Sequence, residues 1–128
     1  MSSLLCPCGT SLPFISCCGR FHAGEPPETA EQLMRSRYCA FVLRDAAYLL
    51  RTWDPRTRPA TLDFDDSLVW QGLEIVRTVR GQAEDTLGMV HFRAHYRFPT
   101  ETGFSADVQE ERSKFTREST DSQWLYLD

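Results

Sequence analysis

The spacing of the cysteines near the amino terminus constrains the fold of this chain more than its other sequence features. Cys6 and Cys8 are separated by one residue, and after an eight-residue loop Cys17 and Cys18 follow as an adjacent pair. Four sulfur atoms arranged in this way can surround one Zn²⁺ at about 2.3 Å each. Metal binding of this kind stabilises a short segment by about 10–16 kcal/mol in apparent terms. The spacing therefore predicts a zinc knuckle that folds without a hydrophobic core of its own.

A histidine close to the second cysteine pair leaves an alternative for the fourth ligand. His22 lies four residues after Cys18 and could complete a Cys₃His site in its place, with equally good tetrahedral geometry. Either set supplies four protein ligands and leaves no open position on the metal. We therefore expect a structural Zn²⁺ held by Cys6, Cys8, Cys17 and Cys18, with His22 as the alternative to Cys18.

The composition is that of an acidic soluble domain. The chain has 128 residues and a formal net charge of −4, and its single lysine is Lys114. Net acidity argues against a general affinity for nucleic acid. No apolar run approaches the roughly 20 residues of a membrane span, and the amino terminus lacks the basic region of a signal peptide. We expect a cytoplasmic protein that contacts neither membrane nor nucleic acid, in a reducing compartment that keeps the thiols free for metal.

Prolines and helix signals mark where the knuckle ends and a larger domain begins. Pro26 and Pro27 stiffen a short connection, which divides the chain into residues 1–25 and 26–128. Thr29 with Gln32 fits a capping box, and apolar residues then recur at helical spacing over residues 30–43. Asp45 is a candidate cap for a second helix over residues 46–53.

The second half of the chain changes to the two-residue period of strands. Segments 73–80, 90–98, 105–118 and 124–127 alternate in polarity and are separated by polar turns. Parity places Glu111, Ser113 and Phe115 on the inward face of the third segment. Two helices followed by an antiparallel meander predict an α+β fold, with the helices laid across one face of a curved, cone-like sheet.

The motifs of the chain resemble a known family. The stretch from Cys6 to Cys18 resembles the SEC-C motif, a zinc knuckle first described in the secretion ATPase SecA. The chain is similar to the YchJ family in five further segments: Leu33–Phe41, Asp45–Leu49, Thr52–Trp53, Glu111–Phe115 and Gln123–Trp124. The resemblance implies a domain like nuclear transport factor 2 behind the knuckle, without an established activity. Thr10–Pro13 replaces the basic segment usual in the motif, so a partner surface built on those basic side chains is not expected.

A candidate pocket follows from this arrangement of helices and sheet. Its predicted residues are Arg35, Arg37, Tyr38, Trp53 and Glu111. An inward glutamate beside helix arginines indicates either a buried ion pair that joins helix to sheet or a polar ligand pocket. Cys39, among apolar neighbours on the same predicted helix, is interpreted as a small buried hydrophobic residue.

The opposite face of the sheet carries a row of basic side chains. His91, Arg93, His95 and Arg97 share one face of the second strand, and Glu110 on the next strand can pair with them. This pattern indicates either a solvated surface or a contact between two copies of the chain. A homodimer through this sheet face is one prediction of the sequence.

Two functions remain open at this point. The preferred hypothesis is a protein-interaction module whose zinc knuckle presents a rigid surface to another protein, because no set of nucleophile, base and orienting group is visible. The alternative is a small-molecule pocket, or a weak enzyme, inside the cone-like domain. An open pocket lined by Tyr38, Trp53 and Glu111 would favour the alternative, and an interior filled by aromatic residues would favour the first hypothesis.

Overall fold

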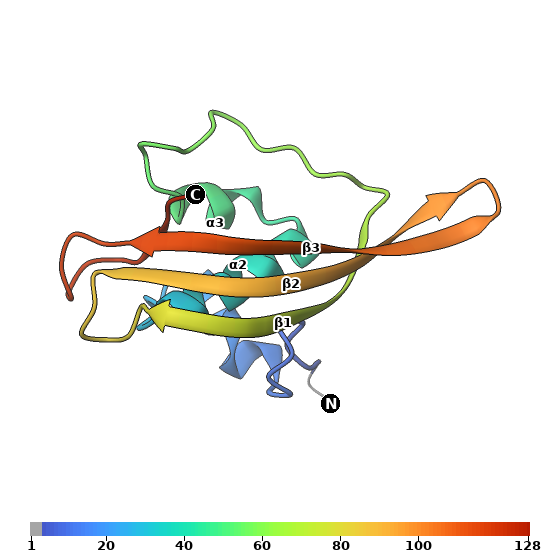
Figure 1. Cartoon of the computed structure of the whole chain (residues 1–128). Helices are drawn as coiled ribbons and strands as arrows, with labels where there is room; N and C mark the ends of the chain where they lie inside the picture. The colour runs from blue at the N-terminus through green and yellow to red at the C-terminus, as the bar shows by residue number, and fades with distance from the viewer. Residues whose placement is uncertain (1–3) are drawn as a thin grey trace.

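The fold is an antiparallel sheet with helices on one face (Figure 1). The structure, a computed structural model, describes residues 4–128. The elements follow in the order η1 (Phe14–Ser16), α1 (Cys18–His22), α2 (Ala30–Leu43), α3 (Ala46–Arg51), β1 (Val69–Arg80), β2 (Leu87–Thr100), β3 (Gly103–Thr116) and β4 (Leu125–Tyr126). The strands lie in the sheet in sequence order. The predicted α+β fold is confirmed.

Side-chain caps define both predicted helices. The Thr29 hydroxyl accepts the backbone N–H of Gln32 at 3.1 Å, and the Gln32 side chain accepts the backbone N–H of Glu28 at 2.7 Å. Asp45 caps α3 by accepting the backbone N–H of Tyr48 at 3.1 Å. These contacts satisfy N–H groups that have no partner within the helix, which is why both helices begin where the sequence predicts. α3 ends at Arg51, two residues earlier than predicted.

Two register shifts bend the sheet around the helices. β1 pairs with β2 in antiparallel register, with irregularities between Trp70 and Gly72 and between Ile75 and Arg77. Bulges of this kind increase the local twist and bend of a strand. β2 and β3 pair without interruption, and their hairpin extends beyond the body of the molecule (Figure 1). The resulting concave face is the one that packs on α2.

The main core lies between α2 and this concave face. α2 contributes Leu33, Met34, Tyr38 and Cys39, which pack with Val90, Phe92, Ala94, Phe115 and Trp124 from the sheet and its last loop. The four cysteines of the amino-terminal segment belong to the same buried cluster. The knuckle therefore extends the core of the larger domain.

Three contacts to backbone carbonyls fix the knuckle against the helices. His22 Nε2 lies 2.8 Å from the Ser36 carbonyl, and Arg35 Nη1 donates to the Cys8 carbonyl at 2.7 Å. Arg51 Nη2 donates to the Phe21 carbonyl at 3.3 Å. These contacts pack the knuckle and the larger domain as one unit. The domain boundary between residues 25 and 26 stays a prediction.

Among residues 4–128, no helix is long and apolar enough to cross a membrane.

Candidate functional site

The four cysteines of the predicted knuckle meet at one point. The Sγ atoms of Cys6, Cys8, Cys17 and Cys18 all lie within 4.8 Å of one another, and all four residues are buried. The Cys8 and Cys17 sulfur atoms are 3.7 Å apart. A buried cluster of four thiols could hold a metal ion.

Tight backbone turns build this cluster. The Cys6 N–H donates to the Leu12 carbonyl at 2.7 Å, and the Phe14 N–H donates to the Leu4 carbonyl at 2.9 Å. Gly9 turns the chain directly after Cys8 with a φ of 92°, a conformation that glycine adopts without steric cost. The second pair then stands at the start of α1, where Cys17 is the residue before the helix. The loop returns the chain so that both pairs face each other.

Hydrogen bonds within the cluster favour ionisation of one thiol. The thiol of Cys18, followed by that of Cys39, lowers the pKa of Cys8 by hydrogen bonding to its sulfur. A metal binds the thiolate form of cysteine, so a lowered pKa at one ligand helps the first step of metal binding.

The structure places His22 outside the cluster. Its Nε2 bonds to the Ser36 carbonyl, and its ring packs against Tyr48 with 4.4 Å between ring centroids. The alternative Cys₃His set is therefore not assembled here, because α1 directs this side chain toward α2. Cys18 takes the fourth position in the cluster.

Cys39 has a neighbour that the sequence did not reveal. It is fully buried as predicted, yet its Sγ lies 3.4 Å from the Sγ of Cys6. Arg35, four residues earlier on the same helix face, contacts the Cys8 carbonyl. The helical spacing of Arg35 and Cys39 could have suggested a shared neighbour, although only the packing identifies that neighbour as the knuckle.

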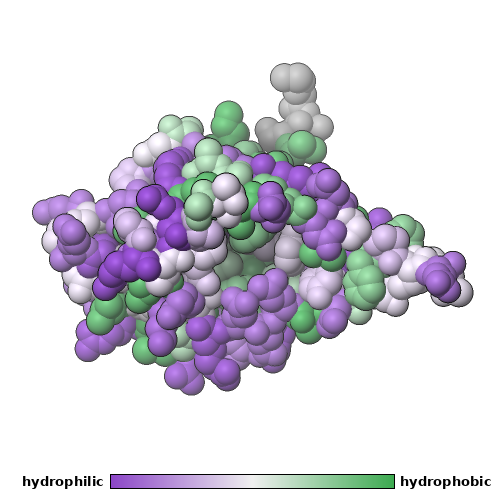
Figure 2. Space-filling model, turned by 90° about the horizontal axis from the view of Figure 1, so that it is seen from above, coloured by the Kyte–Doolittle hydropathy of each residue, from purple (hydrophilic) through white to green (hydrophobic). Residues whose placement is uncertain are grey.

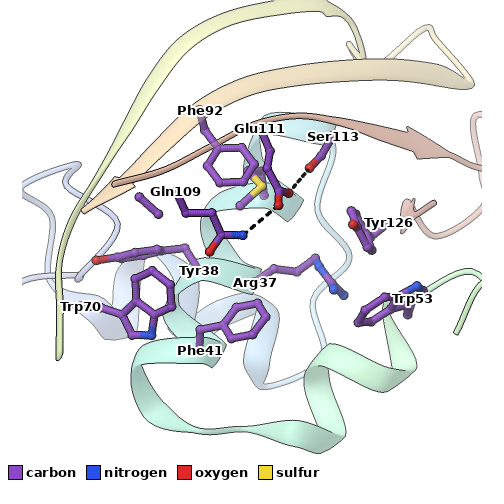
Figure 3. Close-up of a pocket in the computed structure, with 12 residues that line it drawn as sticks. Arg37, Tyr38, Phe41, Trp53, Trp70, Phe92, Gln109, Glu111, Ser113 and Tyr126 are labelled. Atoms are coloured by element: carbon purple, nitrogen blue, oxygen red, sulfur yellow. Dashed lines mark hydrogen bonds between the residues drawn. The ribbon is translucent and has the colours of Figure 1, made fainter. Parts of the chain in front are cut away.

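A cavity of about 220 Å³ lies between α2 and the concave face of the sheet (Figure 3). Its walls are Met34, Arg37, Tyr38, Phe41, Trp53, Trp70, Phe92, Ala94, Gln109, Glu111, Ser113 and Tyr126. Seen from above, the surface of the molecule is hollowed near its centre, with hydrophobic residues in the floor of the hollow (Figure 2).

Four of the five predicted pocket residues line this cavity, and Arg35 does not. Arg35 is directed away, toward Glu31 at 3.0 Å and the Cys8 carbonyl. Residues two positions apart point to different sides of a helix, so Arg35 and Arg37 could not both face the cavity.

Arg37 is the buried charge of the cavity. It is 4% exposed, and its Nη1 donates to the Leu49 carbonyl at 2.8 Å and to Thr52 Oγ1 at 2.7 Å. Its guanidinium lies over the rings of Trp53 and Tyr126, at 5.1 and 4.6 Å from their centroids. Burial lowers the pKa of Arg37 to about 10, so the side chain stays protonated at neutral pH.

Glu111 does not form the predicted buried ion pair. Within residues 4–128 neither Arg35 nor Arg37 forms a salt bridge with it. Its carboxylate is exposed and accepts hydrogen bonds from Gln109 Nε2 at 2.9 Å and Ser113 Oγ at 3.4 Å (Figure 3). Strand parity correctly placed Glu111 on the inward face of the sheet. Because the cavity on that face is open, the Glu111 carboxylate is nevertheless exposed to solvent.

Burial keeps the phenol groups of the cavity neutral. It raises the pKa of Tyr38 to about 12. Burial, and then the negative charge of Glu111, raises the pKa of Tyr126. Apart from these phenols, the ionisable side chains among the cavity walls are one basic residue, Arg37, and one acidic residue, Glu111.

The outer sheet face carries the predicted ion pairs. His91 and Arg93 both contact Glu110, and the distance from Arg93 to Glu110 is 3.3 Å. Glu74 pairs with Arg93 at 3.5 Å and with His95 at 3.7 Å. Three members of the basic row, His91, Arg93 and His95, are thus paired within one copy of the chain. The predicted homodimer through this face stays a prediction.

Comparison with known proteins identifies the larger domain. The family model described as the middle, NTF2-like domain of YchJ matches residues 29–128. A UPF0225 protein of Streptomyces coelicolor is 56% identical over 124 residues, which cover 96% of this chain and 92% of that protein. A UPF0225 protein of Corynebacterium efficiens is 48% identical over the same share of this chain and 90% of its own length.

Solved structures extend the likeness to the knuckle. A SEC-C motif containing protein from Rhodopseudomonas palustris has a TM-score of 0.80 and 26% identity, over 98% of this chain and 96% of its own. A SEC-C motif containing protein from Psychrobacter arcticus has a TM-score of 0.74 and 30% identity, over 97% of this chain and 80% of its own. With both parts matched in order, the chain belongs to the YchJ family, in which an NTF2-like domain follows a SEC-C motif.

Proposed function

We propose that this protein binds a small organic anion in the cavity between α2 and the sheet, and that its knuckle holds a structural Zn²⁺. The observation that carries the proposal is Arg37, a buried guanidinium in the cavity wall that has no carboxylate partner within residues 4–128. The open pocket lined by Tyr38, Trp53 and Glu111 favours this function over the interaction module.

Arg37 has donors left for a ligand. A guanidinium carries five N–H groups, and the two hydrogen bonds of Arg37 both use Nη1. Within residues 4–128, Nε and Nη2 of Arg37 form no hydrogen bond, and Arg37 is one of the residues that line the cavity. Burying a charge without a counter-ion is unfavourable, and a bound carboxylate would supply charge and acceptors together.

The walls define the rest of the ligand. Tyr38, Phe41, Trp70 and Phe92 present rings or ring edges to the cavity (Figure 3). Such walls favour a planar apolar body. The volume of about 220 Å³ limits this body to a small one. A monocarboxylate with one aromatic ring meets these conditions.

The spacing of two of the four thiols matches that of a Zn²⁺ site. A tetrahedral zinc site with Zn–S bonds of about 2.3 Å has sulfur atoms about 3.8 Å apart. The Cys8 and Cys17 sulfur atoms, 3.7 Å apart, match this spacing. Four protein ligands leave no open coordination position, which supports a structural role for the metal.

Titration with three probes that share a phenyl ring and chain length but differ in charge tests the cavity. 3-Phenylpropionate, its neutral amide and 3-phenylpropylamine are added to ¹⁵N-labelled, zinc-loaded protein. The indole N–H signals of Trp53 and Trp70 report the cavity, while Trp124, buried against the Glu28 carbonyl, is the internal control. We expect the anion to shift the first two signals and the amide to bind about tenfold more weakly.

Two variants then assign the charge preference. Arg37→Met should remove the advantage of the anion over the amide. Glu111→Gln should strengthen binding of the anion, because a negative charge leaves the cavity wall. A preference for the amine, or equal shifts at Trp53, Trp70 and Trp124, would contradict the proposal without depending on how well the Arg37 variant folds.

A second candidate function rests on the surface of the knuckle. Four large apolar side chains are exposed there: Leu4 at 84%, Leu5 at 63%, Leu12 at 50% and Ile15 at 75%. These exposed apolar side chains support a contact between the knuckle and another protein. In an affinity pull-down, the zinc-loaded double variant Leu5→Ser, Ile15→Ser should fail to bind partner proteins that the zinc-loaded wild type binds. Identical partner sets for the two forms would overturn this candidate.

A further inference from the structure

The metal centre contains one thiol more than a tetrahedral ion uses. Cys39 Sγ lies 3.4 Å from Cys6 Sγ, and Cys39 belongs to the same buried cluster as the four knuckle cysteines. Cys39 is completely buried on α2, an element outside the knuckle. Five thiols from two parts of the chain therefore share one buried space.

Cys17 and Cys39 have different neighbours in this group. Its sulfur contacts Cys8 at 3.7 Å and the hydroxyl of Thr10 at 3.2 Å. The Thr10 hydroxyl is a ready partner for the Cys17 sulfur when that sulfur is not on the metal. The contact of Cys39 with the cluster is made at Cys6.

We propose that Cys39 is a reserve metal ligand, which replaces Cys17 and keeps four-thiolate coordination when Cys17 leaves the metal. The inference rests on the Zn²⁺ site proposed above. It assigns a fifth cysteine to the centre and ties the metal directly to α2. Exchange between Cys17 and Cys39 needs only one Zn–S bond to break and one to form, with a thiol proton passing from the entering to the leaving sulfur.

Cobalt substitution tests the exchange. Co²⁺ bound to thiolates has a charge-transfer absorption that grows with the number of thiolate ligands, and wild type, Cys17→Ser, Cys39→Ser and the double variant are compared at one equivalent. We expect both single variants to keep the four-thiolate spectrum and the double variant to lose roughly a quarter of the charge-transfer intensity. Identical spectra for Cys17→Ser and the double variant would overturn the proposal.

Zinc release gives a second readout that leaves the four knuckle cysteines intact. A reserve thiol recaptures the metal when Cys17 detaches, so Cys39→Ser should release Zn²⁺ to a chelator several-fold faster than wild type. Ala40→Ser, an equally buried change on the same helix in the cluster around Phe21 and Tyr48, is the matched control. Equal release rates for wild type and Cys39→Ser would count against the proposal. A wild-type protein that binds neither metal would overturn the zinc site itself.

Discussion

At the scale of single residues, Arg117 joins two turns at one end of the sheet. It is 8% exposed, and its guanidinium donates to the carbonyls of Asp85 and Ala83, both at 2.8 Å, and of Thr120 at 3.1 Å. It also lies over the ring of Trp124, at 4.4 Å from the centroid. Arginine presents five N–H donors spread over a planar fork, whereas the ammonium of lysine presents three from a single atom.

Arg117→Lys should therefore destabilise the protein by about 2 kcal/mol, since hydrogen bonds from a charged group are lost at a buried position. Arg112→Lys, at an exposed site on β3 five residues before Arg117, is the control and should stay within about 0.5 kcal/mol of wild type. Urea unfolding measures both. Equal losses in the two variants would contradict this role of Arg117.

Residue-scale predictions from the sequence succeeded where a simple period decides the direction of a side chain. Strand parity placed Glu111 and Ser113 inward, and both line the cavity. The prediction that Arg35 lines the pocket was wrong. Residues two positions apart lie on different sides of a helix, and Arg37 is the one that faces the cavity. The contact of Cys39 with Cys6 could not be predicted, since it depends on how the knuckle packs on α2.

At the scale of elements, α2 starts in close contact with the β1–β2 turn. The Ala30 N–H donates to the Gly81 carbonyl at 2.9 Å. A Cβ atom on Gly88 would lie 2.5 Å from the Gly81 Cα and 3.1 Å from the Ala30 Cβ. The absence of a side chain at Gly88 thus allows the helix and the turn to meet.

Gly88→Ala should cost about 1–3 kcal/mol, because the backbone of the turn must move to accept the methyl group. Gly72→Ala in β1 is the matched control, since a Cβ there would meet nothing within 4 Å. Thermal unfolding distinguishes them. If Gly88→Ala and Gly72→Ala lowered the unfolding temperature equally, the contact between the helix and the turn would not be tightly packed.

The ion pairs of the outer sheet face predict a pH dependence. The hydrogen bond from His91, followed by that from Arg93, lowers the pKa of Glu110 below its ordinary value of 4.5. A carboxylate with a lowered pKa in the folded state adds stability above the unfolded pKa, and this stability disappears as the pH falls through the folded pKa. Wild type should therefore exceed Glu110→Gln in stability at neutral pH and lose that advantage in acid.

Urea unfolding of zinc-loaded protein across this pH range checks the prediction. Glu101→Gln, on the exposed turn between β2 and β3, controls for the change in net charge. The difference in the free energy of unfolding between wild type and Glu110→Gln should shrink as the pH falls. A difference that stays constant into acid would show that the ion pairs do not stabilise the protein through the carboxylate charge.

The elements themselves were largely predictable. Capping residues fixed the starts of α2 and α3, and alternation identified the long strands. The lengths of β1 and β2 were underestimated, since β1 begins at Val69 rather than Leu73 and β2 spans Leu87–Thr100 rather than residues 90–98. The bulges near Gly72 and Ile75 interrupt the alternation on which the prediction depended, and they arise from pairing with β2. α1 was not predicted, because a five-residue helix has too little periodicity to detect.

At the scale of the whole molecule, the knuckle and the larger domain share one core. Cys6, Cys8, Cys17 and Cys18 pack in the same cluster as Leu33 and Phe92. A metal that binds only the folded state stabilises everything that unfolds with it. Loss of the metal should therefore affect the domain as well as the knuckle.

Chelation should lower the unfolding temperature of the whole protein in a single transition and release one equivalent of zinc with four titratable thiols. Differential scanning calorimetry before and after treatment, with zinc added back as the control, measures this. A second, unchanged transition for the larger domain would show that the two parts unfold independently.

The central claim is that the cavity binds an organic anion through Arg37, and a crystal structure of the zinc-loaded protein soaked with 3-phenylpropionate tests it most directly. We predict electron density for the carboxylate at Arg37 Nε and Nη2, with the phenyl ring among Tyr38, Phe41 and Trp70. A cavity without probe density, or a probe whose carboxylate is turned away from Arg37, would contradict the claim.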